Sequence, residues 1–305
     1  EDVDEFLLNL RGGIQQTQDY LLHEVINKLP TVLCEWLLKS AILDRFCAPL
    51  CDAVCQVPGN TEKPGYSGST FIKALCDGNL FVIQLDANGE WYRYHHLFQV
   101  MLQHELAERL AKEQVAELHL HASDWFESQN MIDEAIEHSL ESGNINSAAE
   151  IVERHWRSEM NHDRWYIARR WLGMLPDGPW QQRQEILLLE AWQAMCQQQF
   201  SRFPVLIEQL ELSTKNVSED SLLKRDINFF HGVLEYWQGN GESSFSYLQH
   251  SIKQLPDQPG VMDGWVGLYY CFSLCMNNQK DRAQEDINSL ISGIGISALY
   301  RSQLI

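Results

Sequence analysis

Basic residues are scarce in this chain of 305 residues. It holds 23 Lys and Arg against 42 Asp and Glu, which gives a formal net charge of −19. Proteins that bind the phosphate backbone of nucleic acids, or an anionic membrane surface, rely on Lys and Arg side chains to do so. We therefore expect this segment to contact neither nucleic acid nor a membrane.

Long apolar runs and low-complexity stretches are also missing. The longest apolar stretch, Trp265 to Met276, is shorter than the ~20 residues that span a bilayer. Hydrophobic residues make up 45% of the chain and Pro only 9 positions, so the composition is that of a folded protein. The first residue is Glu1, no secretory signal follows, and residues 298–305 resemble the start of another helix, so we interpret the chain as part of a longer protein.

Motifs that would indicate catalysis are absent. We find no Gly-x4-Gly-Lys-Ser/Thr phosphate loop, no Gly-x-Ser-x-Gly elbow and no His-Glu-x-x-His pair. The Gly-rich segment 65–70 lacks the Lys that reaches a phosphate, and we interpret it as a plain loop. We expect no catalytic residues and no enzyme activity in this segment.

Cysteines offer one alternative. The chain holds 8 Cys, and its size and Leu content favour reduced thiols in a cytoplasm over a disulfide scaffold. Cys47, Cys51 and Cys55 recur every four residues, so a helix would place three thiols on one face, where zinc could bind. That spacing is not typical of zinc sites, so we favour packing of small apolar side chains, with oxidation sensing as a minor alternative.

Histidines offer a second possible metal cluster. His119 and His121 could join His95 and His96 if the fold brought them together. Residues at i and i+2 do not share a helix face, so we favour surface or core histidines and expect no bound metal.

The first part of the chain has the element order of a winged helix. Apolar stripes predict helices over 19–29 and 32–39 and around Leu50 and Val54. Residues 57–69 hold three Gly and two Pro and are expected to form a loop. Ser69 or Thr70 is a candidate cap for the next helix, 71–76, which Asp77-Gly78-Asn79 ends.

The only convincing strand pair follows. Residues 80–85 are aromatic and β-branched, Asp86-Ala87-Asn88-Gly89 contains the hairpin dipeptide Asn-Gly, and 90–94 alternate and return. A helix begins near Leu97, which completes a layout of helices, hairpin and closing helix.

The rest of the chain is predicted to be helical. Residues 97–127 form one long helix or two stacked helices, and helix pairs follow. Small residues recur at a spacing of twelve, at Gly232 and Ser244 and again at Cys271 and Ala283, as in tetratricopeptide repeats. Ser123 and Ala135 show the same spacing. Such pairs stack into a solenoid with a concave binding surface.

A dense aromatic stripe lies within this helical region. It could form a sugar or peptide groove, but large aromatic residues are common in helix packing, which we favour. Its members are Trp156, Trp165, Tyr166, Trp171 and Trp180.

The hairpin region resembles a known family. The stretch NLFVIQLDANGEWYRYHHLF, residues 79–98, is similar to a segment of the large LuxR-type transcriptional activators, the family of MalT. The stronger similarity covers about residues 15–176. Supporting matches lie at 19–25, 37–45, 50–52, 121–126, 133–140 and 171–176.

The resemblance implies a mainly α fold with a winged-helix arm over residues 1–110 and a tetratricopeptide-like sensor over 111–305. In that family an N-terminal ATPase binds ATP or ADP and a C-terminal helix-turn-helix binds DNA; both would belong to the parent protein. Implied partners are the parent's own ATPase domain and a small-molecule inducer or regulatory protein in the repeats, with oligomerisation on activation. No cofactor is expected in this chain itself.

One residue receives a specific role from the resemblance. Related switch ATPases carry Met-His-Asp-Leu after the wing, and its His contacts the β-phosphate of ADP. Tyr94-His95-His96-Leu97 stands at that point, with Tyr for Met and His for Asp, so His95 is the candidate nucleotide-sensing residue. His95 capping or packing the helix is the alternative, and Arg93 is expected at the surface. A solenoid adaptor without a nucleotide switch is the alternative function.

Overall fold

The computed structural model describes residues 29–56, 66–213, 221–256 and 259–292. The predicted helix over 19–29 and the helix start at 298–305 therefore lie largely or wholly outside the described residues. The chain divides into two compact units, Glu1–Asn144 and Ile145–Ile305. Each is mainly helical, as the sequence predicts.

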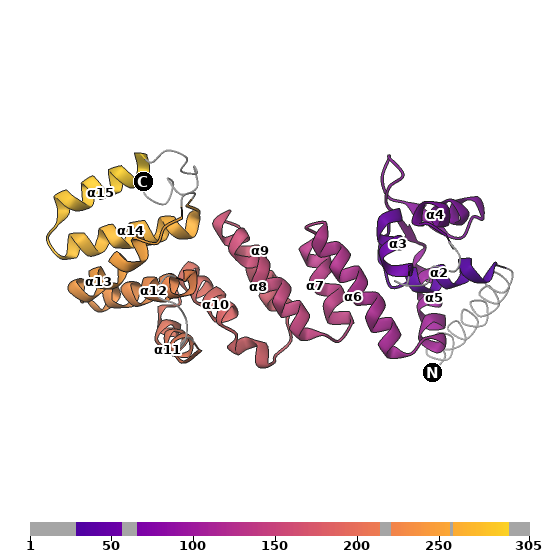
Figure 1. Ribbon diagram of the computed structural model, residues 1–305, viewed down its shortest axis with the longest axis horizontal. Coiled ribbons are helices and arrows are strands. Elements are labelled where there is room, and N and C mark those ends of the chain that lie inside the picture. The colour runs from indigo at the N-terminus through magenta and orange to yellow at the C-terminus, as the bar shows by residue number, and fades with distance from the viewer. Residues whose placement is uncertain (1–28, 57–65, 214–220, 257–258, 293–305) are drawn as a thin grey trace, which may run out of the picture. The chain divides into compact units, whose positions relative to one another are not determined.

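The N-terminal unit begins with the predicted winged-helix layout (Figure 1). The strands β1 and β2 pair antiparallel, with Val82 opposite Tyr94. Phe46 forms a β-bridge to Tyr92, which gives the hairpin a third extended neighbour. The elements in order are α2 (Thr31–Ser40), α3 (Ala48–Cys55), α4 (Gly68–Asp77), β1 (Val82–Gln84), β2 (Tyr92–Tyr94) and α5 (His96–Arg109).

The wing turn has the chemistry that its sequence predicts. Gly89 has a φ of +69°, a conformation that residues with a Cβ rarely adopt. The Asp86 carboxylate accepts hydrogen bonds from the backbone N–H groups of Glu90 (2.9 Å) and Trp91 (2.8 Å). The side chain of the first residue of the turn, Asp86, thus stabilises the turn.

The start of α4 corrects two expectations. Its N-cap is Ser67, whose Oγ accepts from the Thr70 N–H at 3.2 Å, rather than Ser69 or Thr70. Residues 68–70 are therefore the first turn of a helix and not loop. Gly68 is required by packing, because a Cβ there would lie 1.9 Å from the carbonyl oxygen of Ala48 on α3.

Two further helices complete the N-terminal unit. They are α6 (Lys112–Ser128) and α7 (Ile132–Glu141), so the segment 97–127 is two helices with a break at Leu110 and Ala111. Ser123 Oγ donates to the carbonyl oxygen of Ala135 at 2.7 Å, across the α6–α7 contact. These helices group with the N-terminal unit; the expected domain boundary after residue 110 stays a prediction.

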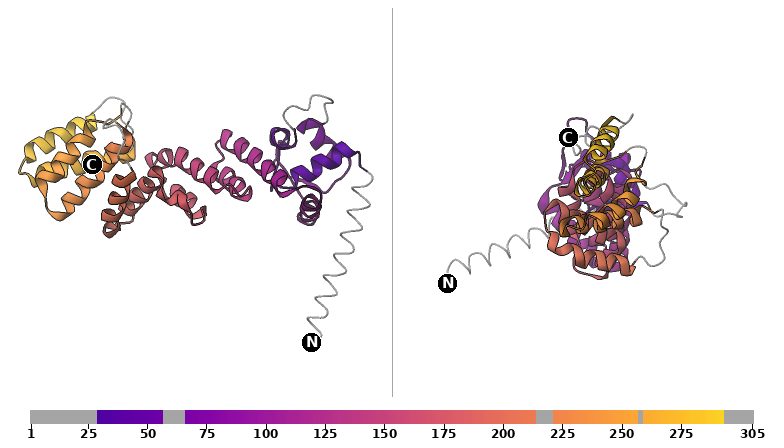
Figure 2. Two further views of the ribbon diagram at one scale, coloured as in Figure 1. Left: turned by 60° about the horizontal axis from the view of Figure 1, so that its bottom comes forward. Right: turned by 90° about the vertical axis from the view of Figure 1, so that its left-hand side faces the viewer.

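The C-terminal unit is built from consecutive helix pairs, with no strand among its described residues (Figures 1 and 2). None of the described helices of either unit is long and apolar enough to cross a membrane. The elements in order are α8 (Ile145–Asn161), α9 (Trp165–Met174), η1 (Pro179–Gln182), α10 (Gln184–Cys196), η2 (Phe200–Arg202), α11 (Phe203–Ser213), α12 (Leu222–Gln238), α13 (Gly241–Ile252), α14 (Val261–Met276) and α15 (Lys280–Ser292).

The predicted spacing of twelve marks real helix contacts. Gly232 of α12 lies against α13, where a Cβ would meet the Leu248 side chain at 2.4 Å. Cys271 of α14 and Ala283 of α15 are both buried. The identification of these pairs as tetratricopeptide repeats stays a prediction. The core of the C-terminal unit contains packed aromatic rings: Trp192 of α10 is stacked on Phe229 of α12, with 4.9 Å between ring centroids.

Candidate functional site

The candidate nucleotide-sensing residue lies where β2 meets α5. The preceding residue, Tyr94, is fully buried, and its hydroxyl lies 2.6 Å from Ser40 Oγ on α2. His95 has extended backbone, and its N–H donates to the Phe81 carbonyl at 2.7 Å. Its side chain is exposed. A buried anchor on one side and a backbone bond on the other thus hold His95 at the surface.

His95 is the N-cap residue of α5, but its side chain makes no capping hydrogen bond. The first turn of α5 also contains no acidic residue. The N–H groups of a helix's first turn lack partners within the helix and favour anions. The first-turn N–H groups of α5 are therefore available to bind a phosphate oxygen, and the exposed imidazole of His95 lies beside them.

Neighbouring side chains agree with this geometry. Arg93 is exposed on β2, as predicted, and His96 is exposed at the first position of α5. The alternative in which His95 packs into the domain does not fit its exposure. The nucleotide-sensing role itself stays a prediction.

The three cysteines of the candidate zinc cluster are buried around α3. Burial raises the pKa of the Cys47 and Cys55 thiols, and that of Cys51 well above its ordinary value. Zinc binds the thiolate, so these environments oppose the ligand form. Within the described parts of the chain, no three His, Cys, Asp or Glu side chains are placed to hold a metal ion.

The structure does not bring His119 and His121 together with His95 and His96 in the metal cluster that the sequence makes possible but does not favour. His119 of α6 lies against His138 of α7, with 2.9 Å between the two Nδ1 atoms. His121 lies on another face of α6, and its Nδ1 is buried without a hydrogen-bond partner among the described residues. The exposed His95 and His96 are the N-cap and the first residue of α5. The pairing of His119 with His138 depends on the α6–α7 contact, which residue spacing does not reveal.

The aromatic stripe is divided between core and surface. Trp156, Trp171 and Trp180 are buried, as the packing interpretation predicts. Tyr166, by contrast, is 58% exposed. The stripe therefore forms no single groove.

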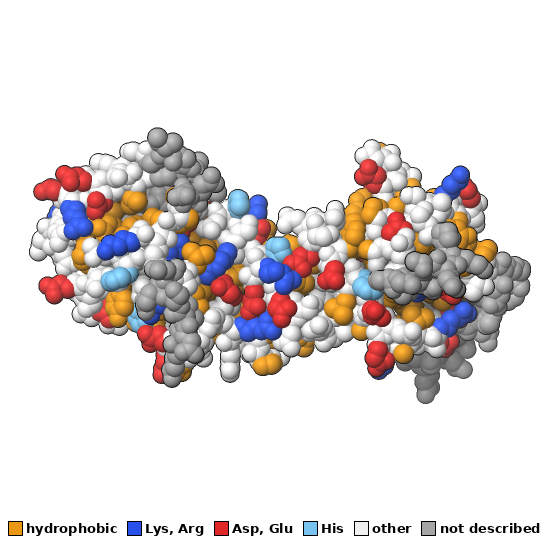
Figure 3. Space-filling model, viewed as in Figure 1, with side chains coloured by type: hydrophobic (Ala, Val, Ile, Leu, Met, Phe, Trp, Pro, Cys, Tyr) orange, Lys and Arg blue, Asp and Glu red, His pale blue; other side chains and the backbone are white. Residues whose placement is uncertain are grey.

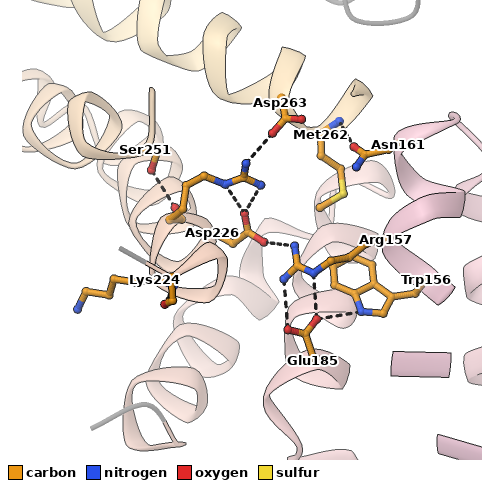
Figure 4. Close-up of polar contacts among 11 residues, drawn as sticks. Trp156, Arg157, Asn161, Glu185, Lys224, Asp226, Ser251, Met262 and Asp263 are labelled. Carbon is orange, nitrogen blue, oxygen red and sulfur yellow. Dashed lines mark hydrogen bonds and ion pairs between the residues drawn. The ribbon is translucent and has the colours of Figure 1, made fainter. Parts of the chain in front are cut away.

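A buried ionic network in the C-terminal unit was not predicted (Figure 4). Arg157 of α8 donates from Nη1 to Asp226 Oδ2 on α12 at 2.7 Å and from Nε to Glu185 Oε2 on α10 at 3.0 Å. Arg225 donates from Nη2 to Asp226 Oδ1 at 2.9 Å and from Nη1 to Asp263 Oδ1 on α14 at 2.7 Å. Two guanidinium groups and three carboxylates thus join four helices.

The interior of this network excludes water. The side chains of Arg225, Asp226 and Asp263 are 5%, 0% and 3% exposed. Burial raises the pKa of Asp263, while Arg225 lowers it. Because the buried charges are paired, the network is suited to fixing helix positions rather than to proton transfer. Asp263, an acidic residue within an otherwise apolar helix, is a feature of the sequence that indicates a buried charge and thus a buried partner.

No basic face is seen on the surface shown in Figure 3, where acidic and basic side chains are interspersed over the described residues. Helix α4, which precedes the wing, carries one Lys and one Asp. Helices that read DNA from this position approach a polyanion. That this segment does not contact nucleic acid stays a prediction.

One comparison with known proteins extends these observations. Residues 22–114 match a family model described as the MalT winged helix domain. The matched range includes α2 to α5, with the wing and His95. The chain is therefore similar, over its winged helix, to MalT-type regulators of transcription.

Proposed function

We propose that this chain is the regulatory portion of a MalT-type, ATP-dependent transcriptional activator of the LuxR family. The winged helix relays the nucleotide state of the parent's ATPase domain, and the helical repeats bind an inducer or a regulatory protein. The chain itself has no catalytic role and carries no cofactor; ATP or ADP binds the parent protein. The parent acts in the cytoplasm and oligomerises on activation.

The observation that carries the proposal is His95 at the uncapped start of α5. In the resting state, this imidazole and the first-turn N–H groups contact a phosphate of ADP bound to the ATPase domain. The contact favours the closed state because it is made only there. An inducer shifts the population toward the open state if it binds that state more tightly.

The repeats offer exposed aromatic side chains for inducer binding. Trp237 of α12 is 53% exposed and Phe272 of α14 is 39% exposed. Tyr236, also of α12, is stacked on Phe272 with 5.8 Å between ring centroids. Exposed aromatic residues of this kind bind ligands by stacking and apolar contact.

The test is His95→Ala in the full-length parent protein. We expect less ADP to copurify and transcription without inducer to rise, because the closed state loses a contact. His104→Ala is the matched control, since its side chain lies on the same helix and is 71% exposed. Unchanged ADP retention and resting activity in His95→Ala would reject the nucleotide relay and favour the adaptor.

A further inference from the structure

A cleft of about 750 Å³ lies within the N-terminal unit, away from His95. It is bounded by the start of α3, the exposed face of α4, the wing and the end of α6. Its volume falls in the range of ~300–1,000 Å³ typical of small-molecule sites. Neither the winged-helix match nor the proposed nucleotide relay gives this cleft a role.

The walls of the cleft are largely apolar and aromatic. Trp91 of the wing and Trp125 of α6 meet edge to face, with 6.2 Å between ring centroids and 70° between planes. Ile72 and Tyr92 add further apolar surface. This arrangement offers ring edges and faces to a flat apolar group.

The Trp91 wall is held before any ligand arrives. The Arg45 guanidinium lies 4.8 Å from the centroid of the Trp91 ring. Arg45 also forms an ion pair with Glu134 of α7. The wing is thus fixed to the α6–α7 pair, and a fixed wall reduces the entropy that a ligand must lose on binding.

Two opposite charges line the same cleft, and neither has an ion-pair partner among the described residues. Lys73 projects from α4, and Glu90 belongs to the wing. Within the described residues neither side chain forms an ion pair, so they lie more than 4.0 Å from each other and from other charges of opposite sign. A ligand that carries both an anionic and a cationic group satisfies both.

We propose that this cleft binds a small aromatic zwitterion, a dipeptide with an aromatic side chain and free termini. Its ring packs against Trp91 and Trp125, its carboxylate pairs with Lys73, and its ammonium group pairs with Glu90. Apolar walls with a few polar groups are the usual composition of such sites. The inference stands apart from the nucleotide relay, since no residue is shared with the start of α5.

The experiment is calorimetric titration of the full chain with the dipeptide Phe-Ala. Ala-Ala tests the need for the ring, Phe-Ala amide lacks the carboxylate, and N-acetyl-Phe-Ala lacks the ammonium group. We expect Phe-Ala to bind, and the amide and the N-acetyl analogue each to bind about fivefold to tenfold more weakly because each loses one charge-assisted contact. Ala-Ala should also bind more weakly, because it has no ring to pack against the two Trp side chains.

Variants assign each charge to one end of the ligand. We expect Lys73→Gln to weaken the binding of Phe-Ala and to leave the binding of Phe-Ala amide unchanged. We expect Glu90→Gln to weaken the binding of Phe-Ala and to leave the binding of N-acetyl-Phe-Ala unchanged. Both residues are exposed, so folding is kept. Lys112→Gln, at the start of α6 and outside the cleft, is the control. Absence of Phe-Ala binding at millimolar concentration, equal binding of Ala-Ala, or insensitivity to both variants would overturn the proposal.

Discussion

Ser244 donates a hydrogen bond from Oγ to the carbonyl oxygen of Gly232 at 2.8 Å, across the contact between α12 and α13. Ser123 makes the same kind of bond to Ala135 at 2.7 Å, across α6 and α7. The partners are twelve residues apart in both pairs. The distance between packed helices depends on the side chains at their contact, so small residues allow this close approach. The spacing seen in the sequence therefore has a physical basis.

This close approach makes Gly232 sensitive to substitution. In Gly232→Ala the added Cβ would lie 2.4 Å from the Leu248 side chain, so we expect a loss of about 1–3 kcal/mol in the free energy of unfolding. Gly173→Ala in α9 is the control, because it has open space and a helical backbone. There we expect a gain of about 0.5–1 kcal/mol. Urea denaturation measures both, and equal effects would contradict the packing argument.

The cysteines predict a pattern of chemical reactivity. Burial raises the thiol pKa of all three of Cys51, Cys55 and Cys76, most strongly for Cys51 and Cys55, which are buried, whereas Cys76 is exposed. Because the thiolate is the nucleophile, iodoacetamide at pH 8 should modify Cys76 in the native chain and the two buried thiols only in denaturant. Peptide mapping by mass spectrometry distinguishes them. Rapid native labelling of Cys51 would instead support an oxidation-sensing role.

Local sequence predicted the winged-helix elements well, because their signals lie close together along the chain. Asn88-Gly89 supplies the turn residue with positive φ, and the alternation around Arg93 gives the correct exposed position. The predicted helix 71–76 starts three residues later than α4 does, because neither the capping box of Ser67 nor the contact of Gly68 with Ala48 can be recognised in a Gly-rich segment.

The remaining features depend on contacts between distant residues. Arg157 meets Asp226 across 69 positions, and Arg45 meets Glu134 across 89. No spacing rule joins such residues, because helix packing brings them together. His95 was placed by resemblance and found exposed at a helix start, whereas the cleft beside Trp91 needed the three-dimensional fold.

The ionic network predicts a strong effect from one conservative change. Asp226→Asn removes the negative charge that pairs with both Arg157 and Arg225. The two guanidinium groups then have too little negative charge near them. We expect a loss of about 3–5 kcal/mol in the free energy of unfolding. Arg164→Gln breaks an ion pair in which the Arg side chain is 44% exposed, and should cost far less, because solvent screens an exposed ion pair. Urea denaturation of both variants makes the comparison; a small loss in Asp226→Asn would show that the network tolerates an unpaired charge.

The histidine pair predicts a pH dependence of stability. Burial, which is the larger cause, and the neighbouring His119 together lower the pKa of His138 to about 4 in the folded chain, against ~6.5 in the unfolded chain. The unfolded state therefore binds more protons between these values. The contribution to stability is fully present above pH ~6.5 and is lost as the pH falls through about 4, at up to ~1.4 kcal/mol per pH unit.

Urea denaturation between pH 7.5 and 4.5 measures this loss. His138→Gln should have a shallower pH dependence than the unchanged chain, because its side chain does not titrate. His104→Gln should keep the full slope, since His104 is exposed and its Glu108 partner is exposed as well. Because His138→Gln also changes the surroundings of His119, the slope difference reports the pair; the acidic residues that line the same pocket, Asp44, Glu137 and Glu141, are the same in all three chains. Parallel curves for His138→Gln and the unchanged chain would mean that His138 protonates equally in the folded and unfolded states, and that the pair with His119 opens without cost.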